Sequence, residues 1–236
     1  MEGHTWSAPQ EVQGEVINIF LELGALEENG HFVYTSGKHG AAYVAKDLVV
    51  PATTRVVELC GLMFDQLGGV EMIDTVIGIA PIGGILSSHL ALEIEQMTGR
   101  PAFSIFAEKV HTRDYVAGSH RKGELFEHLD VRESLRDFID PQQRILIVED
   151  VLNTGGSVKK LIKLVRELGG SDIWGVAALW NRGGVTADDL DVPNLFSLCD
   201  LQYEAWEAAN CPFCRDDVPL TTKFGHSNDS VANSGL

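Results

Sequence analysis

Residues 144–157 read Arg-Ile-Leu-Ile-Val-Glu-Asp-Val-Leu-Asn-Thr-Gly-Gly-Ser and combine three features in a fixed order. Residues 145–148 are a continuous apolar run, which predicts a buried strand of a parallel sheet. Glu149 and Asp150 follow at its carboxyl end, where open α/β sheets bind their ligands. Residues 153–157 then form a glycine- and hydroxyl-rich turn that opens a helix. Free backbone N–H groups and the helix dipole at such a turn favour a bound phosphate.

This stretch has two other interpretations. In an ordinary strand–turn–helix, the acids and Ser157 would only cap the helix. A Walker loop is excluded, because it needs a lysine directly after its last glycine and Ser157 follows Gly156. The joint pattern is much rarer than either and favours a sugar phosphate. The turn would bind the phosphate, while Glu149 and Asp150 would accept hydrogen bonds from ring hydroxyls.

The composition predicts a soluble globular protein. The chain has 236 residues, enough for one sizeable α/β domain, and 44% of them are hydrophobic. No apolar run approaches the roughly 18 residues that are needed to span a membrane. The N-terminus has acids and Trp6 where a signal peptide would need a basic start and an apolar stretch. With only four cysteines, we expect a reduced, cytoplasmic protein.

The net charge of −16, from 34 acidic and 18 basic residues, excludes whole classes of partner. A uniformly acidic surface repels nucleic acid and anionic membranes, so neither is expected to bind. Against this background, one basic segment stands out. Residues 109–122 hold four Lys or Arg and two His against the single acid Asp114. The alternative for this segment is a solvated surface hairpin.

Hydrophobic periodicity predicts alternating strands and helices. Strands are expected at 31–35, 42–45, 74–80, 101–107, 145–148, 173–180 and 194–198. Amphipathic helices are expected at 9–24, 56–67, 86–97 and 158–168. This alternation predicts an α/β fold, a mostly parallel sheet with helices on both faces. We expect one domain over residues 1–220 and a disordered tail over 221–236, which is rich in Ser, Asn and Gly.

A second anion site is predicted after the strand at 74–80. Residues 78–84 read Gly-Ile-Ala-Pro-Ile-Gly-Gly and lead into a helix. Glycines at a strand-to-helix turn permit unusual backbone angles and the close approach of a ligand. A tight turn that needs glycine only for packing is an equal alternative. Combined with the phosphate turn at 153–157, this loop becomes a natural partner for a second phosphate group.

Cys211 and Cys214 form a single CxxC pair, which leaves three interpretations open. Zinc would need two more ligands, and Cys199 and His226 are candidates at unremarkable spacing. A thioredoxin-like redox pair would need a preceding strand and a helix start, for which the sequence gives no support. Two reduced cysteines in a C-terminal turn are the simplest interpretation.

Together these motifs resemble the type I phosphoribosyltransferases, with the orotate phosphoribosyltransferases as the nearest family. The resemblance covers most of residues 10–185 and rests on the turn at 153–157, the loop at 80–84 and the basic segment. It implies a type I phosphoribosyltransferase fold with a small hood, built from residues 1–50 and the C-terminal segment. It also implies transfer of the phosphoribosyl group of 5-phosphoribosyl-1-diphosphate (PRPP) to a base, with Mg²⁺ as cofactor and a homodimer as the assembly.

The resemblance assigns roles to matched residues. The PRPP site would comprise Glu149, catalytic Asp150, Val151, Leu152, Asn153, Thr154, Gly155, Gly156 and Ser157. The pyrophosphate loop would be Ala80, Pro81, Ile82, Gly83 and Gly84. A mobile loop would bring three side chains to the leaving pyrophosphate: catalytic Lys109, His111 and Arg113. The base would contact Lys38, Tyr43, Val44, Asn153 and Arg182. No protein ligand is assigned to Mg²⁺, which PRPP would mainly hold.

Orotate is the favoured base, because Arg182 suits its carboxylate and Tyr43 its ring. A purine or another base is the alternative within the family. Outside enzymology, the same fold could serve as a PRPP- or nucleotide-sensing regulator that binds RNA. That function would need a basic face, which a chain of net charge −16 does not suggest.

Overall fold

The computed structural model describes residues 2–34, 36–113 and 125–222. Within these residues the main body is a seven-stranded sheet in the order β1-β11-β10-β9-β6-β7-β8. The strands are β1 His4–Ser7, β6 Thr75–Ile79, β7 Phe103–Arg113, β8 Leu125–Asp130, β9 Arg144–Leu152, β10 Asp172–Asn181 and β11 Asn194–Cys199. All neighbours run parallel except β7 and β8, which form an antiparallel arm.

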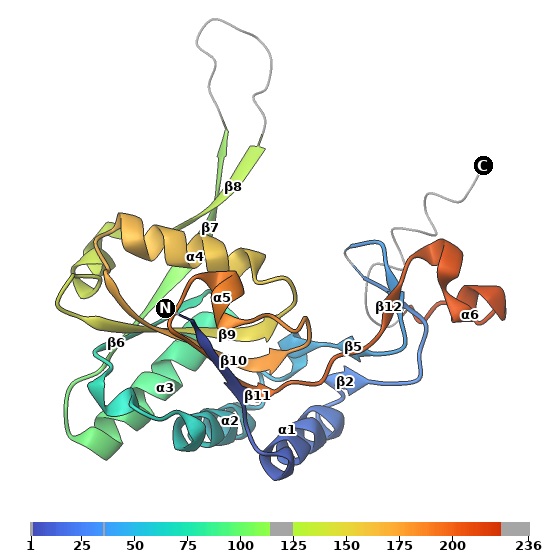
Figure 1. Ribbon diagram of the computed structural model, residues 1–236, viewed down its shortest axis with the longest axis horizontal. Coiled ribbons are helices and arrows are strands. Elements are labelled where there is room, and N and C mark those ends of the chain that lie inside the picture. The colour runs from blue at the N-terminus through green and yellow to red at the C-terminus, as the bar shows by residue number, and fades with distance from the viewer. Residues whose placement is uncertain (1, 35, 114–124, 223–236) are drawn as a thin grey trace, which may run out of the picture.

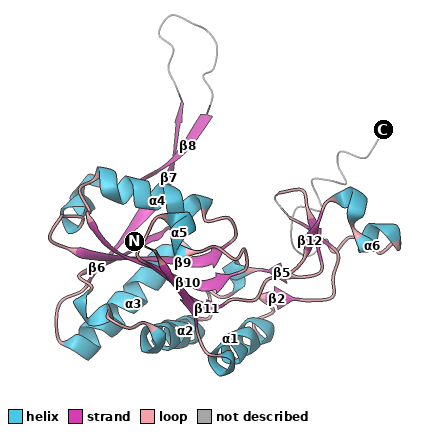
Figure 2. Ribbon diagram, in the orientation of Figure 1, coloured by secondary structure: helices cyan, strands magenta, loops and turns pink. Residues whose placement is uncertain are grey.

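Helices cover both faces of this sheet (Figures 1 and 2). One face carries α1 Gln10–Glu22, α2 Thr53–Gln66 and α3 Ile82–Thr98, and the other carries α4 Gly156–Glu167 and α5 Ala187–Leu190. Successive side chains of a strand point to opposite faces. Leu146 and Val148 of β9 accordingly join the core under α1–α3, whereas Ile145 and Ile147 join the core under α4 and α5. The mostly parallel, doubly covered sheet predicted from the sequence is confirmed.

A small hood lies beyond the carboxyl ends of β9 and β10 (Figure 1). Its strands are β2 Leu26–Glu27, β3 Phe32–Val33, β4 His39–Gly40, β5 Tyr43–Val44 and β12 Ala205–Trp206. β2 pairs with β5, and β4 lies between β3 and β12, all antiparallel. The C-terminal segment therefore completes a sheet that the N-terminal segment begins. The other short helices of the described residues are η1 Lys46–Leu48, η2 Val70–Met72, η3 Glu133–Phe138, η4 Ala208–Asn210 and α6 Pro212–Arg215.

Three elements differ from the sequence prediction. β1 was not predicted, because four residues without clear alternation carry no signal until β11 pairs with them at the sheet edge. β7 continues six residues beyond the predicted end at Ala107, because β8 supplies hydrogen-bond partners for its polar half. The predicted strands at 31–35 and 42–45 shorten to the two-residue strands β3 and β5, which pair with β4 and β2.

Two further predictions concern the end of α3 and the C-terminal tail. Met97, which ends the amphipathic helix predicted at 86–97, is 69% exposed in the last turn of α3, so it does not share the buried face of that helix. In the tail predicted at 221–236, the N–H of Thr221 donates to the carbonyl of His31, and the N–H of His31 donates to the Thr221 hydroxyl. Residues 223–236 lie outside the described part of the chain. No helix in that described part is long and apolar enough to cross a membrane.

Candidate functional site

The two acids of the main motif lie near the end of β9, and a lysine from the hood side pairs with one of them. Asp150 is buried, and Lys46 of η1 places its Nζ 2.9 Å from Oδ2 and 3.1 Å from Oδ1. The N–H of Val151 also donates to Oδ1. Lys46 was not predicted as a site residue, because 104 positions separate it from Asp150 in the sequence. The only local signal was a charged pair, Lys46-Asp47, directly after a predicted strand.

Burial and charge set the protonation of this cluster. Burial, and then the neighbouring Asp150, raise the pKa of Glu149 to about 8, while Lys46 and Lys109 oppose the rise. Burial disfavours the charged form of Lys46, but Asp150, Glu149 and Asp47 outweigh it and raise the Lys46 pKa. Lys46 and Asp150 therefore form an ion pair, beside a carboxyl group that holds its proton more tightly than an exposed glutamate would.

The turn after β9 forms a cradle, as the sequence predicted. Gly155 has φ +71°, a left-handed conformation that favours glycine, and it directly precedes α4. The turn borders a pocket of about 190 Å³. Its lining consists of Lys46, Glu149, Val151, Leu152, Asn153, Thr154, Gly155, Gly156, Ser157 and Val158. Eight of the nine residues assigned to the PRPP site thus line one pocket, and Asp150 lies behind it, paired with Lys46.

The second predicted anion turn lies beside the first, because β6 and β9 are parallel neighbours. Gly78 and Gly83 touch so closely that a Cβ atom on Gly78 would collide with the Gly83 backbone. The alternative of a glycine kept for packing therefore applies at these two positions. The side chain of Ile82 is buried in the core under α1–α3, so it does not point into the turn. Only the backbone of residue 82 can face a ligand.

A larger pocket of about 710 Å³ adjoins the smaller pocket at the turn after β9. The two share four lining residues: Lys46, Val151, Asn153 and Thr154. All five residues assigned to the base, Lys38, Tyr43, Val44, Asn153 and Arg182, line this larger pocket. Residues that the sequence analysis did not assign also line it: Tyr34, Ser36, Lys46, Gly183, Tyr203 and Ala205. These unassigned residues come mostly from the hood, and local sequence patterns do not predict how the hood packs against the ends of the strands.

Arg182 is held against the hood by an aromatic ring. Its guanidinium carbon lies 4.6 Å from the centroid of the Tyr34 ring, a cation–π distance. Its backbone N–H donates to the carbonyl of Leu152. The Tyr34 hydroxyl donates to the carbonyl of Ala42 at 2.6 Å, which fixes the ring. Burial raises the Tyr34 pKa while Arg182 lowers it, so the phenol stays neutral and the pocket keeps a positive charge at this wall.

The match to known families agrees with this arrangement of two anion turns and an adjoining pocket. Residues 63–209 match the family described as phosphoribosyl transferase domain, a span that contains both turns and Arg182. This chain belongs to the phosphoribosyltransferase family.

Relatives of this phosphoribosyltransferase carry a narrower name. The orotate phosphoribosyltransferase of Caldanaerobacter subterraneus subsp. tengcongensis is 35% identical over 208 residues, which cover 87% of this chain and 94% of the relative. That of a Thermoanaerobacter species is 36% identical over 209 residues, with the same coverage. That of Thermotoga maritima is 32% identical over 207 residues, covering 85% of this chain and 92% of the relative.

Solved structures show the same fold at lower identity. The adenine phosphoribosyl transferase of Trypanosoma brucei is 13% identical and covers 97% of this chain and 96% of its own, with a TM-score of 0.54. The orotate phosphoribosyltransferase of Francisella tularensis is 15% identical and covers 78% of this chain and 85% of its own, with a TM-score of 0.50.

Lys109 and Lys38 remain among the assigned residues that the structure describes. Lys109, in the β7–β8 arm, lowers the pKa of Glu149 through its charge and borders a small hollow that Ser157 of the turn also lines. The side chains of His111 and Arg113, and residues 114–122 of the assigned loop, lie outside the described residues. Lys38 pairs with Glu207 at 3.4 Å, and both side chains are exposed.

Proposed function

We propose that this phosphoribosyltransferase transfers the 5-phosphoribosyl group of PRPP to orotate, giving orotidine 5′-phosphate and pyrophosphate. A ring nitrogen of the base forms a bond to the anomeric carbon, and the bond from that carbon to the pyrophosphate oxygen breaks with its electron pair. The observation that carries the proposal is the joining of a phosphate cradle to a larger pocket through Lys46, Val151, Asn153 and Thr154. The names of relatives at 35% and 36% identity support orotate as the base.

The chain's own residues account for binding and orientation. The turn at 153–157 offers backbone N–H groups and a helix N-terminus to the 5-phosphate. Glu149 and the Lys46–Asp150 pair lie beside it, where ribose hydroxyls would donate hydrogen bonds. Lys38, Lys46 and Arg182 give the adjoining pocket three cations, and the orotate carboxylate matches a guanidinium fork.

The site fits Mg²⁺ held mostly by the substrate. Mg²⁺ takes oxygen ligands and usually binds one or two carboxylates together with substrate phosphates. Asp150 already accepts hydrogen bonds from Lys46 and from the Val151 N–H, so of the two acids Glu149 would bind the ion, giving up the proton that its raised pKa retains near neutral pH. When bound, Mg²⁺ would neutralise charge on the departing pyrophosphate.

A panel of bases tests the substrate. Orotate, uracil, hypoxanthine, xanthine and adenine are each incubated with PRPP and Mg²⁺, and pyrophosphate release is measured. We expect turnover of orotate alone. Turnover of a purine without orotate would contradict the substrate, and no turnover of any base would contradict the activity.

Arg182→Ala tests the base pocket separately. Losing a charge-assisted hydrogen bond to the carboxylate should raise the KM for orotate by about tenfold to hundredfold, while PRPP binding hardly changes. Arg166→Ala is the matched control, since Arg166 pairs with Asp191 on the outer side of α4, away from both pockets. An unchanged orotate KM in Arg182→Ala would remove Arg182 from the base site.

We also propose that the chain acts as a homodimer. The β7–β8 arm extends from the sheet past α4 (Figure 1), and a lone two-stranded arm buries little of its own surface. Light scattering should give twice the chain mass of 25.7 kDa. A monomeric mass at assay concentrations would contradict the proposal.

A further inference from the structure

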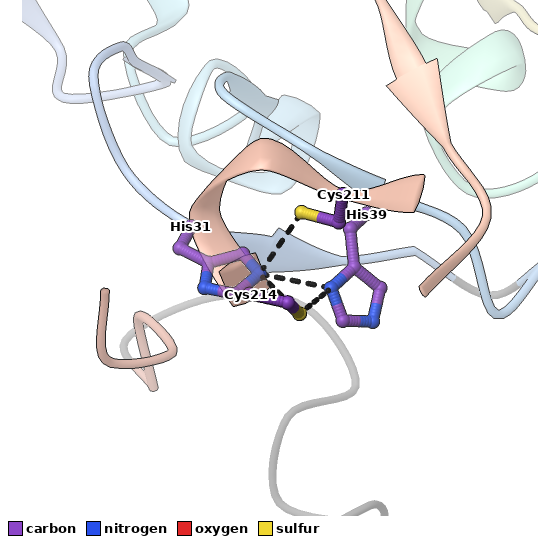
Figure 3. A group of neighbouring side chains, drawn as sticks. All are labelled: His31, His39, Cys211 and Cys214. Carbon is purple, nitrogen blue, oxygen red and sulfur yellow. Dashed lines mark hydrogen bonds between the residues drawn. The ribbon is translucent and has the colours of Figure 1, made fainter. Parts of the chain in front are cut away.

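Four metal-ligating side chains meet in the hood, away from the PRPP pocket. His31 precedes β3, His39 lies in β4, and Cys211 and Cys214 lie at the start of α6 (Figure 3). One ligand atom from each lies within 4.8 Å of every other. Three of the four residues are buried and only Cys214 is exposed. The sequence separates the histidines from the cysteines by about 180 positions, so their meeting is a product of the fold.

The ligand-atom distances suit a small tetrahedral ion. With Zn–S near 2.3 Å and Zn–N near 2.0–2.1 Å, tetrahedral geometry separates a sulfur and a nitrogen ligand by about 3.5 Å. His31 Nε2 lies 3.5 Å from Cys211 Sγ and 3.6 Å from Cys214 Sγ, and His39 Nδ1 lies 3.3 Å from Cys214 Sγ. The two ring nitrogens are 2.8 Å apart, so an ion would spread them by about half an ångström.

The surroundings of His31 prepare it as a ligand. Its Nδ1 lies 2.8 Å from the carbonyl oxygen of Val218, which can only accept, so Nδ1 carries the proton. The lone pair of Nε2 then points at the other three ligand atoms (Figure 3). Metal-bound histidines are typically fixed in this way by a carbonyl behind the ring. A single lone pair can accept only one hydrogen bond, whereas one cation can bind all four groups together.

A metal cross-link would also stabilise the hood, whose own secondary structure is small. Its strands are two residues long, and such small units usually gain stability from a metal or a disulfide. Phe213, between the two cysteines, stacks on His31 at 5.4 Å and meets Trp206 edge-on at 5.8 Å. Phe213 thus packs on one ligand of the cluster, and β4 connects the cluster to the wall that carries Tyr34 and Lys38.

We propose that His31, His39, Cys211 and Cys214 bind one structural Zn²⁺ that joins the N-terminal hairpin of the hood to the C-terminal segment. Two thiolates and two imidazoles in tetrahedral arrangement are a common structural zinc set, and soft sulfur ligands disfavour Mg²⁺ and Ca²⁺. The partners of the CxxC pair are thus the two hood histidines. Cys199, considered from spacing, is buried at the end of β11 in the main core, and His226 lies outside the described residues.

Metal analysis of the full chain tests the proposal without reference to catalysis. After purification without a histidine tag, elemental analysis should find one zinc per chain. A strong chelator should remove it with a lowered Tm, and added Zn²⁺ should restore both. Cobalt(II) in place of zinc should show the visible absorption of a tetrahedral site with thiolate ligands. Because these readouts need no substrate, they remain informative even if the orotate assignment fails.

Matched variants locate the ion. Cys214→Ser changes an exposed side chain, so it should fold and lose most of the zinc. Cys60→Ser and His4→Ala, which alter a cysteine and a histidine outside the cluster, should keep it. A full-length chain that neither contains zinc nor takes up one equivalent would overturn the proposal in favour of a hydrogen-bonded cluster. A mass lower by two hydrogens, with no free thiol at positions 211 and 214, would overturn it in favour of a disulfide.

Discussion

Asp150 and Lys46 illustrate what single residues contribute to the site. Asp150 is 4% exposed and lies in β9, a strand inside the main sheet. Its partner Lys46 comes from η1, a short helix beside the hood. The pair therefore joins the two parts of the molecule at the point where the two pockets meet. A ligand in either pocket would contact this junction through Lys46.

Asp150→Asn tests the role of the carboxylate. The substitution keeps the shape but removes the charge that pairs with Lys46, so kcat/KM should fall by about a hundredfold or more with the fold intact. Steady-state kinetics and circular dichroism measure the two effects. Asp172→Asn, which breaks a half-exposed ion pair with Arg144, should leave kinetics unchanged. Wild-type kinetics in folded Asp150→Asn would show that the carboxylate is dispensable.

Glu149 gives a pH dependence with a definite sign. Its pKa is raised from 4.5 to about 8, so between these values the unfolded chain ionises Glu149 while the folded chain keeps it protonated. Unfolding then releases a proton, and stability falls as the pH rises through this window and levels off above it. Without substrate, the Tm of Glu149→Gln should fall less than that of wild type from about pH 5 to 9. Equal slopes, with exposed Glu167→Gln as control, would contradict the raised pKa.

The residues that line the smaller pocket could be found from the sequence because most of them are contiguous. Strand, acids and turn follow one another within residues 144–157, and local propensity and spacing suffice to read them. Lys46 and Tyr34 could not be predicted, because they reach the site only through the packing of the hood on the strand ends. Ile82 was assigned to the ligand loop by position, and its apolar side chain packs into the core instead.

At the scale of elements, the β7–β8 arm combines structure and chemistry. β7 pairs with β6 as far as Ala107. From Glu108, which lies opposite Asp130, β7 pairs with β8 alone. Lys109 is in the first part of this arm, and its charge reaches Glu149 of the same chain. The arm thus carries a cation from the sheet edge toward the acids.

Lys109→Ala separates binding from catalysis. If its charge matters most as pyrophosphate departs, kcat should fall far more than PRPP affinity. Kinetics give kcat, and calorimetry with PRPP gives the dissociation constant. Lys163→Ala is the control, because Lys163 is an exposed lysine of α4 paired with Glu167. Equal losses in kcat and affinity would make Lys109 a ground-state binding residue.

Long apolar elements were predictable, and short ones were not. The buried runs of β6, β9 and β10 and the amphipathic face of α4 carry strong periodic signals, so their positions were found. Two-residue strands such as β4 and β12 have no period to detect, and only tertiary pairing defines them.

For the whole molecule, the two pockets predict that PRPP binding and base binding can be separated, because different segments line them. The cradle is lined by Lys46 and by residues of β9, its turn and the first residues of α4, whereas Tyr203 and Ala205 of the C-terminal segment line the adjoining pocket. A chain ending at Gln202 should therefore retain PRPP binding and lose turnover of the base. Calorimetry and the pyrophosphate assay measure these, with a chain ending at Thr222 as control. Normal turnover in the shorter chain would show that the C-terminal segment does not form the base site.

The pairing of distant segments sets the order in which the molecule can be completed during synthesis. β1 finds its partner only when β11 has been made, and β4 gains its second neighbour only with β12. A chain emerging from the ribosome therefore carries two open strand edges until its last quarter appears. The turn at 153–157, which we propose binds the 5-phosphate, can form earlier, since β6, β9 and α4 precede it or follow it closely. The nascent protein would acquire the means to hold a sugar phosphate before it acquires the wall that selects what the sugar is joined to.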